Sequence, residues 1–166
     1  DLYVQDYGYL YGLKTGVFRM SCIYGTRQFG VEDQGWVAWF VIATILGKPI
    51  TIYGDGKQVR DILYVTDLVS AFDSFISSNL DHAVFNMGGG SLNTISLLEL
   101  LELLEEQTGK RSAIDFSQWR PSDQKVYISD ISKAKRELAW EPTIIPRDGI
   151  SKLIEWVVKN KSLFPG

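Results

Sequence analysis

Hydrophobic and polar positions along the chain follow two periods, one typical of strands and the other of helices. Short apolar runs bounded by glycine, proline or polar residues predict strands at 14–23, 50–53, 59–65, 83–87, 114–116 and 126–128. Apolar residues spaced three or four apart predict helices at 1–12, 33–46, 66–78, 96–108 and 146–160, with a short helix from Asp130 or Ser132 to just before Trp140. Strands that alternate with helices indicate an α/β protein with mostly parallel strands.

Capping residues mark the ends of these predicted helices. Asp33 is the predicted N-cap of the second helix, and Thr66 or Asp67 that of the third. Ser96, with Glu99 three residues later, predicts a capping box at the start of the fourth helix. The glycines predicted to end helices are Gly12, Gly47 and Gly109.

The first predicted helix has no cap before it, so we expect the chain to be part of a longer polypeptide. Its 166 residues suffice for one domain or for an interdependent part of a larger one. A hydrophobic content of 45% allows a buried core, and the net charge of -3 gives no general attraction for nucleic acid or an anionic membrane. The longest apolar run, 36–46, is shorter than a bilayer span of about 20 residues. With one cysteine, a cytoplasmic protein is expected.

Two arginines next to turn residues are the candidates for phosphate binding. Arg60 precedes Asp61 in a predicted strand that follows the glycine turn at 54–56, and a guanidinium there can bind a phosphate through two hydrogen bonds. A structural Arg–Asp pair is the alternative. Arg120 and Asp123 flank a proline and a serine, so one short loop could bind both a diphosphate and a ribose hydroxyl. The alternative for this loop is a solvated surface segment.

Other chemical signals in the sequence are weaker. Gln34 and Trp36 stand at the start of a predicted helix, where free backbone amides favour an anionic ligand. The glycines at 88–90 suit either a turn or a close approach to a ligand. We assign no metal site and no catalytic role to His82, the only histidine, and Cys22 is expected to be a packed thiol.

Several segments, in one order, resemble the C-terminal half of the extended short-chain dehydrogenases/reductases, the NAD-dependent sugar-nucleotide epimerases and dehydratases. These segments are 18–25, 54–67, 85–89, 120–123, 130–142 and 149–156. The resemblance implies the C-terminal portion of a Rossmann-type NAD-binding epimerase with its smaller, substrate-binding α/β lobe. Residues 1–28 would end the Rossmann domain, 29–166 would mainly form the lobe that binds a nucleotide-sugar, and 66–88 would return to the Rossmann sheet.

The resemblance also implies roles for individual residues. Arg60 and Arg120 would hold the diphosphate and Asp123 the ribose, while Ile52 and Tyr53 would flank the base. Gln34 and Trp36 complete the expected substrate-binding set. The nicotinamide of NAD would be bordered by Ser21, Cys22, Ile23 and Tyr24. The catalytic tyrosine and lysine of the family are expected upstream of Asp1, so the chain alone should be inactive.

Within the family, segment 24–40 resembles the CDP-tyvelose (CDP-paratose) 2-epimerases, which implies a CDP-linked sugar and a transient 2-keto intermediate. One departure is Cys22, at a position where family members commonly have asparagine. A 4-epimerase, a 4,6-dehydratase or a decarboxylase of nucleotide-sugars would share the same half. A non-catalytic nucleotide-binding module is the alternative from another class. A homo-oligomer is also possible, because extended family members are often dimers.

Overall fold

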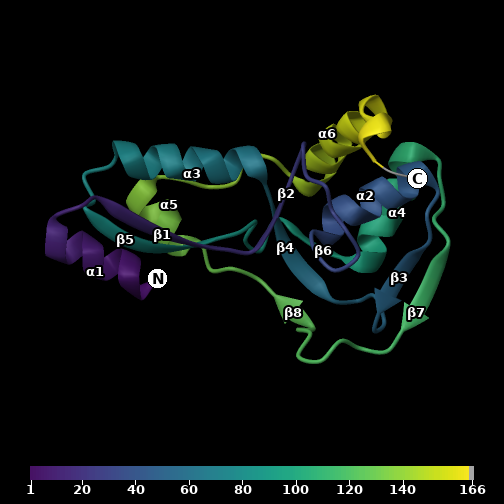
Figure 1. Cartoon of the computed structure of the whole chain (residues 1–166), viewed down its shortest axis with the longest axis horizontal. Helices are drawn as coiled ribbons and strands as arrows, with labels where there is room; N and C mark the ends of the chain where they lie inside the picture. The colour runs from purple at the N-terminus through teal and green to yellow at the C-terminus, as the bar shows by residue number, and fades with distance from the viewer. Residues whose placement is uncertain (165–166) are drawn as a thin grey trace.

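The computed structural model describes residues 1–164 as an α/β structure (Figure 1). Its helices are α1 (Leu2–Tyr11), α2 (Trp36–Leu46), α3 (Val65–Ser77), α4 (Leu97–Thr108), α5 (Ser132–Leu138) and α6 (Pro146–Lys159), followed by a 3₁₀ turn at Lys161–Leu163. Its strands are β1 (Thr15–Met20), β2 (Cys22–Tyr24), β3 (Ile50–Tyr53), β4 (Val59–Tyr64), β5 (His82–Met87), β6 (Thr94–Ser96), β7 (Ile114–Ser117) and β8 (Val126–Tyr127). The predicted α/β class is confirmed.

The strands pair mostly in parallel, as the sequence predicts. β1 pairs with β5, β2 with β4, β4 with β8 and β3 with β7, all in parallel, whereas β6 lies antiparallel to β4. The prediction of one continuous strand at 14–23 is wrong, because the chain stops pairing with β5 and begins to pair with β4 at Ser21. Its backbone N–H still bonds Met87 O of β5 at 2.8 Å, while its hydroxyl turns to Asp61 of β4. β6 was not predicted from the sequence.

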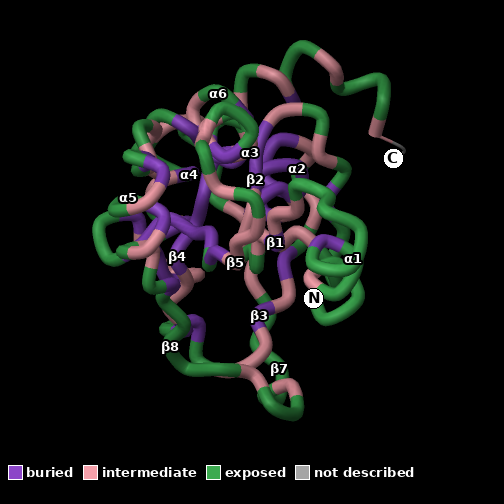
Figure 2. The backbone as a smooth tube through the Cα atoms, turned by 90° about the vertical axis from the view of Figure 1, so that its left-hand side faces the viewer, coloured by how far each residue is buried: buried purple, intermediate pink, exposed green. Residues whose placement is uncertain are grey.

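Two hydrophobic clusters form the core. The first cluster packs α2, α4 and α6 around β3 and β4, and its fully buried residues include Ile52 and Ile62. The second packs α3 and α5 against β5 and includes Phe85. Figures 1 and 2 show α1 on the other side of the β1–β5 pair from α5. The predicted division at residue 28 stays a prediction, although β1 and β5 bring 66–88 back beside the N-terminal strand.

The local end signals of the helices are mostly confirmed. Gly12, Gly47 and Gly109 adopt positive φ at the ends of α1, α2 and α4. The predicted caps, Asp33 for α2 and Thr66 or Asp67 for α3, are wrong. Gly35 precedes α2, because the side chain of Asp33 bonds Arg120 instead, and Tyr64 precedes α3, because the carboxylate of Asp67 is buried against residues 143–144. No helix of residues 1–164 is long and apolar enough to cross a membrane.

The predicted capping box of α4 is confirmed and gives a pH-dependent prediction. Glu99 accepts the Ser96 N–H at 2.7 Å, and the Ser96 hydroxyl accepts the Glu99 N–H at 3.2 Å. The hydrogen bond from the Ser96 backbone N–H to the charged carboxylate lowers the pKa of Glu99, and the Ser96 side chain acts in the same direction. The stability that this shift contributes is therefore present above the ordinary carboxylate pKa of about 4.3 and is lost as the pH falls through the lower folded-state value.

Glu99→Gln should reduce the acid dependence of the urea midpoint below neutral pH. An unchanged acid limb would contradict this account.

Candidate functional site

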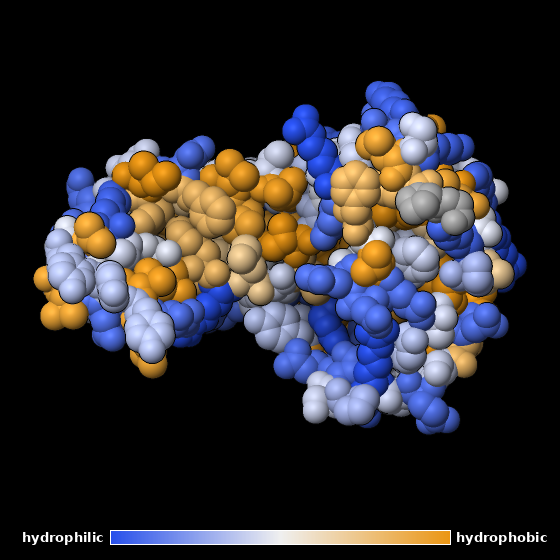
Figure 3. Space-filling model, viewed as in Figure 1, coloured by the Kyte–Doolittle hydropathy of each residue, from blue (hydrophilic) through white to orange (hydrophobic). Residues whose placement is uncertain are grey.

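A cavity of about 340 Å³ opens where α2 begins, between β3, β4 and the 120–123 loop. In Figure 3 hydrophilic side chains gather over this region, whereas apolar ones cover more of the part that holds β1 and β5. Six of the seven predicted substrate-binding residues line the cavity: Gln34, Trp36, Tyr53, Arg60, Arg120 and Asp123. The sequence-predicted residues thus converge in space, and their roles toward a ligand stay predictions.

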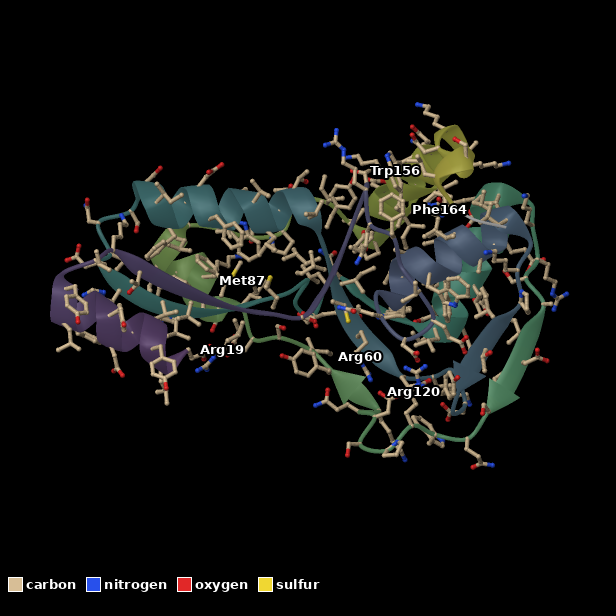
Figure 4. The ribbon with its side chains drawn as sticks, in the orientation of Figure 1. Arg19, Arg60, Met87, Arg120, Trp156 and Phe164 are labelled. Atoms are coloured by element: carbon tan, nitrogen blue, oxygen red, sulfur yellow. The ribbon has the colours of Figure 1, made fainter. Side chains whose placement is uncertain are left out.

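Arg60 is fixed in the cavity wall by an ion pair. Its Nη2 lies 2.6 Å from Asp123 Oδ1, and its Nη1 donates to the Val59 carbonyl at 2.9 Å. The Arg60 side chain is 15% exposed, so its remaining donors are partly withheld from water and can bind an anion strongly. Figure 4 shows Arg60, on β4, and Arg120 near each other in the region of this cavity.

The alternative pairing of Arg60 with Asp61 does not form. Successive residues of a strand point to opposite faces, and Asp61 turns into the interior away from the cavity. Its carboxylate accepts the Ser21 hydroxyl at 2.5 Å and the Gly90 N–H at 3.1 Å. A Cβ at Gly88 would lie 2.0 Å from Asp61 Oδ2, so this glycine leaves the space that the Asp61 carboxylate occupies.

Arg120 lies against an aromatic ring at the mouth of the cavity. Its guanidinium carbon is 4.0 Å from the centre of the Tyr53 ring, and its Nη2 bonds Asp33 Oδ1 at 2.9 Å. Ser122 adopts a positive φ of 63°, and the Asp123 N–H returns to the Arg120 carbonyl at 3.2 Å. This tight turn places the Asp123 carboxylate next to Arg60 and leaves Arg120 at the rim.

Thr51 and Gln58 line the cavity at positions that the sequence did not single out. Ile50 and Ile52 of β3 are fully buried, so Thr51, not the side chain of Ile52, lines the cavity beside Tyr53. The alternation of β3 could have identified Thr51. Gln58 is buried and its Nε2 reaches the Tyr53 carbonyl at 2.5 Å, which no local pattern predicts. Among residues 1–164 no three His, Cys, Asp or Glu side chains gather as a metal site.

Of the four residues expected to border nicotinamide, one lines the cavity. Cys22 does so, and its Sγ accepts the Trp36 Nε1–H at 3.4 Å. The Ser21 hydroxyl is already bonded to Asp61, and Ile23 packs against the second core cluster. Tyr24 is buried edge-on against Tyr64, and burial raises its pKa. The expected place of all four residues beside a nicotinamide ring stays a prediction.

The half-buried thiol of Cys22 gives a second prediction. Burial raises the pKa of Cys22 above its ordinary value, although the Trp36 N–H and Arg60 act in the opposite direction. Because the thiolate is the reactive form, Cys22 should react with iodoacetamide at pH 7.5 at least about ten-fold more slowly than glutathione. Mass spectrometry can follow the single adduct over time. Labelling as fast as that of glutathione would contradict the raised pKa of this thiol.

Comparisons with known proteins decide the family of the chain. The family profile described as GDP-mannose 4,6 dehydratase matches residues 1–153. The chain belongs to the extended short-chain dehydrogenases/reductases. CDP-paratose 2-epimerase of Salmonella typhi is 40% identical over 163 residues, 94% of this chain, and UDP-glucuronate 4-epimerase of Thermodesulfobacterium geofontis is 34% identical over 98% of it. The chain spans about half the length of the curated relatives it matches, 48% and 49% for these two.

Solved structures of this family share the fold. UDP-glucose 4-epimerase of Thermotoga maritima with UDP-glucose has a TM-score of 0.87 and 34% identity, covering 96% of this chain and 51% of that one. UDP-glucuronic acid 4-epimerase of Bacillus cereus, in complex with UDP-glucuronic acid and NAD, has a TM-score of 0.82 and 27% identity, covering 97% and 49%. The expected C-terminal region of a Rossmann-type epimerase is thus confirmed, and NAD is the cofactor of the family.

Proposed function

We propose that this chain is the substrate-binding part of an NAD-dependent nucleotide-sugar epimerase and that its cavity holds the nucleoside diphosphate. The observation that carries the proposal is the convergence of Arg60 and Arg120, from segments 60 residues apart in sequence, on one cavity. Their guanidinium groups suit the oxygens of a diphosphate. Tyr53, beside Arg120, offers an aromatic face for a base, and Asp123 a carboxylate for ribose hydroxyls.

The proposed reaction is 2-epimerisation of a CDP-linked sugar such as CDP-paratose. Its support is the 40% identity with CDP-paratose 2-epimerase over nearly the whole chain and the resemblance of segment 24–40 to that subfamily. NAD bound to the whole enzyme would supply reversible hydride transfer at the sugar. The residues of this chain would bind and orient the substrate. The catalytic tyrosine and lysine would lie outside it, so we expect no turnover by this chain alone.

Calorimetric titration with CDP, UDP and GDP in parallel tests the base preference. We expect CDP to bind more tightly than UDP and GDP, and NAD to give no comparable heat. A preference for UDP or GDP would retain the nucleotide-sugar cavity and overturn the CDP assignment. A folded chain that binds none of the three would contradict the proposed function.

A further inference from the structure

The two arginines of the cavity are already paired with carboxylates. Arg60 is bonded to Asp123, and Arg120 to Asp33. The cavity is lined by three acidic residues, the third being Glu32, against these two basic ones. An excess of carboxylates is unexpected at a site for a multiply charged anion, because repulsion between like charges makes the free energy of anion binding less favourable.

The two ion pairs differ in what else holds the carboxylate. Asp123 is 24% exposed, comes from the same turn as Arg120, and has Oδ2 within 3.4 Å of Gln58 Nε2. Asp33 is 87% exposed, and its carboxylate bonds Arg120, 87 residues away in sequence. An exposed pair of this kind contributes little to stability and is readily exchanged. Asp123 is thus part of the wall, whereas Asp33 reaches Arg120 from a separate loop.

The loop that carries Asp33 touches the opposite wall twice. Glu32, its neighbour, accepts the Tyr53 hydroxyl at 2.9 Å. The backbone of Val31 and Gln34 closes this loop with two hydrogen bonds of 2.9 and 3.0 Å, so both acidic side chains project from one tight turn. The turn leads directly into α2 at Gly35, whose φ is +76°. Residues 31–34, named here the acidic turn, therefore cover the rim of the cavity through Tyr53 and Arg120.

We propose that Asp33 is an intramolecular competitor of the ligand diphosphate for Arg120, and that ligand binding breaks one of the two contacts that hold the acidic turn at the cavity rim. This inference rests on the proposed function, since it assigns Arg120 to the diphosphate. Asp33 holds the guanidinium over the Tyr53 ring in the free protein. An entering diphosphate replaces the Asp33 carboxylate on that guanidinium and repels it, so the turn loses one of its two cross-cavity contacts.

Titration calorimetry with CDP and with inorganic pyrophosphate, on wild type, D33N and E32Q, tests the proposal. D33N keeps the size of the side chain but removes its charge, so both ligands should bind about two- to five-fold more tightly, the scale of an exposed ion pair. E32Q removes one charge from the same turn without touching Arg120, so it should change affinity less than D33N. In an R120A background the gain from D33N should disappear.

The outcomes separate this inference from the proposed function. Unchanged or weaker binding of both ligands by D33N, with wild type binding CDP, would overturn the competition and leave the cavity assignment intact. An equal gain in E32Q and D33N, or a gain that persists in R120A, would overturn it as well, because general cavity charge would then explain the effect. Absence of CDP binding by folded wild type would overturn both.

Discussion

Arg60→Ala should weaken CDP binding by about ten- to a hundred-fold. The change removes charge-assisted hydrogen bonds worth about 1.5–3 kcal/mol, which correspond to factors of that size. It also leaves the Asp123 carboxylate without its ion-pair partner in a cavity wall where it would face the incoming diphosphate. Titration calorimetry of both proteins at one salt concentration measures the effect, since screening alters such interactions.

Two further variants make the Arg60 result interpretable. Arg111→Ala removes the same charge from a side chain that is 84% exposed and does not line the cavity, so CDP affinity should stay within about two-fold of wild type. Arg60→Lys keeps the charge but loses the planar fork and should lie between the two. An Arg60→Ala protein that is folded and binds CDP like wild type would contradict the assignment of the diphosphate to this residue.

Asp67→Ala should lower the free energy of unfolding by about 3 kcal/mol or more. Asp67 is 3% exposed, and its carboxylate accepts three hydrogen bonds: from Thr143 N at 3.1 Å, Thr143 Oγ1 at 2.7 Å and Ile144 N at 2.9 Å. Truncation leaves these donors without their acceptor, at about 1–3 kcal/mol for each unsatisfied group. Asp67 also lies in the first turn of α3, where its charge favours the helix.

Urea unfolding followed by far-UV circular dichroism measures the effect of Asp67→Ala. Asp73→Ala is the matched control, because Asp73 is exposed on the same helix and its loss should change stability by less than about 0.5 kcal/mol. Equal midpoints for the two variants would contradict the structural role of the buried carboxylate.

Local signals predicted the fold where the interactions themselves are local. The capping box of Ser96 and Glu99 spans three residues, and the glycines that end helices act through their own φ. The partner of a strand or a carboxylate is decided by distant segments. The break at Ser21 depends on Asp61, and the side chain of Asp67 turns to Thr143, 76 residues on. Periodicity and capping rules carry no information about such partners.

The residues of the candidate site were predicted from their types and their order in the sequence. The ion pairs between them were not. The family resemblance pointed to Arg60, Arg120 and Asp123, and the fold places them at one cavity. The salt bridge of Arg60 with Asp123 joins residues 63 apart and could not be read from the adjacent Asp61. For Ile52, the resemblance predicted a position beside the base that its side chain does not occupy. Its side chain is buried because β3 alternates, so a role beside the base is left to its backbone.

A crystal structure of the chain with CDP tests the central claim most directly. The account predicts a diphosphate within hydrogen-bond distance of both Arg60 and Arg120, in the cavity at the start of α2. The pyrimidine should lie against the ring of Tyr53. In that complex Arg120 should bond a phosphate oxygen in place of Asp33. CDP bound elsewhere on the molecule, with both arginines still paired only to Asp123 and Asp33, would contradict the account.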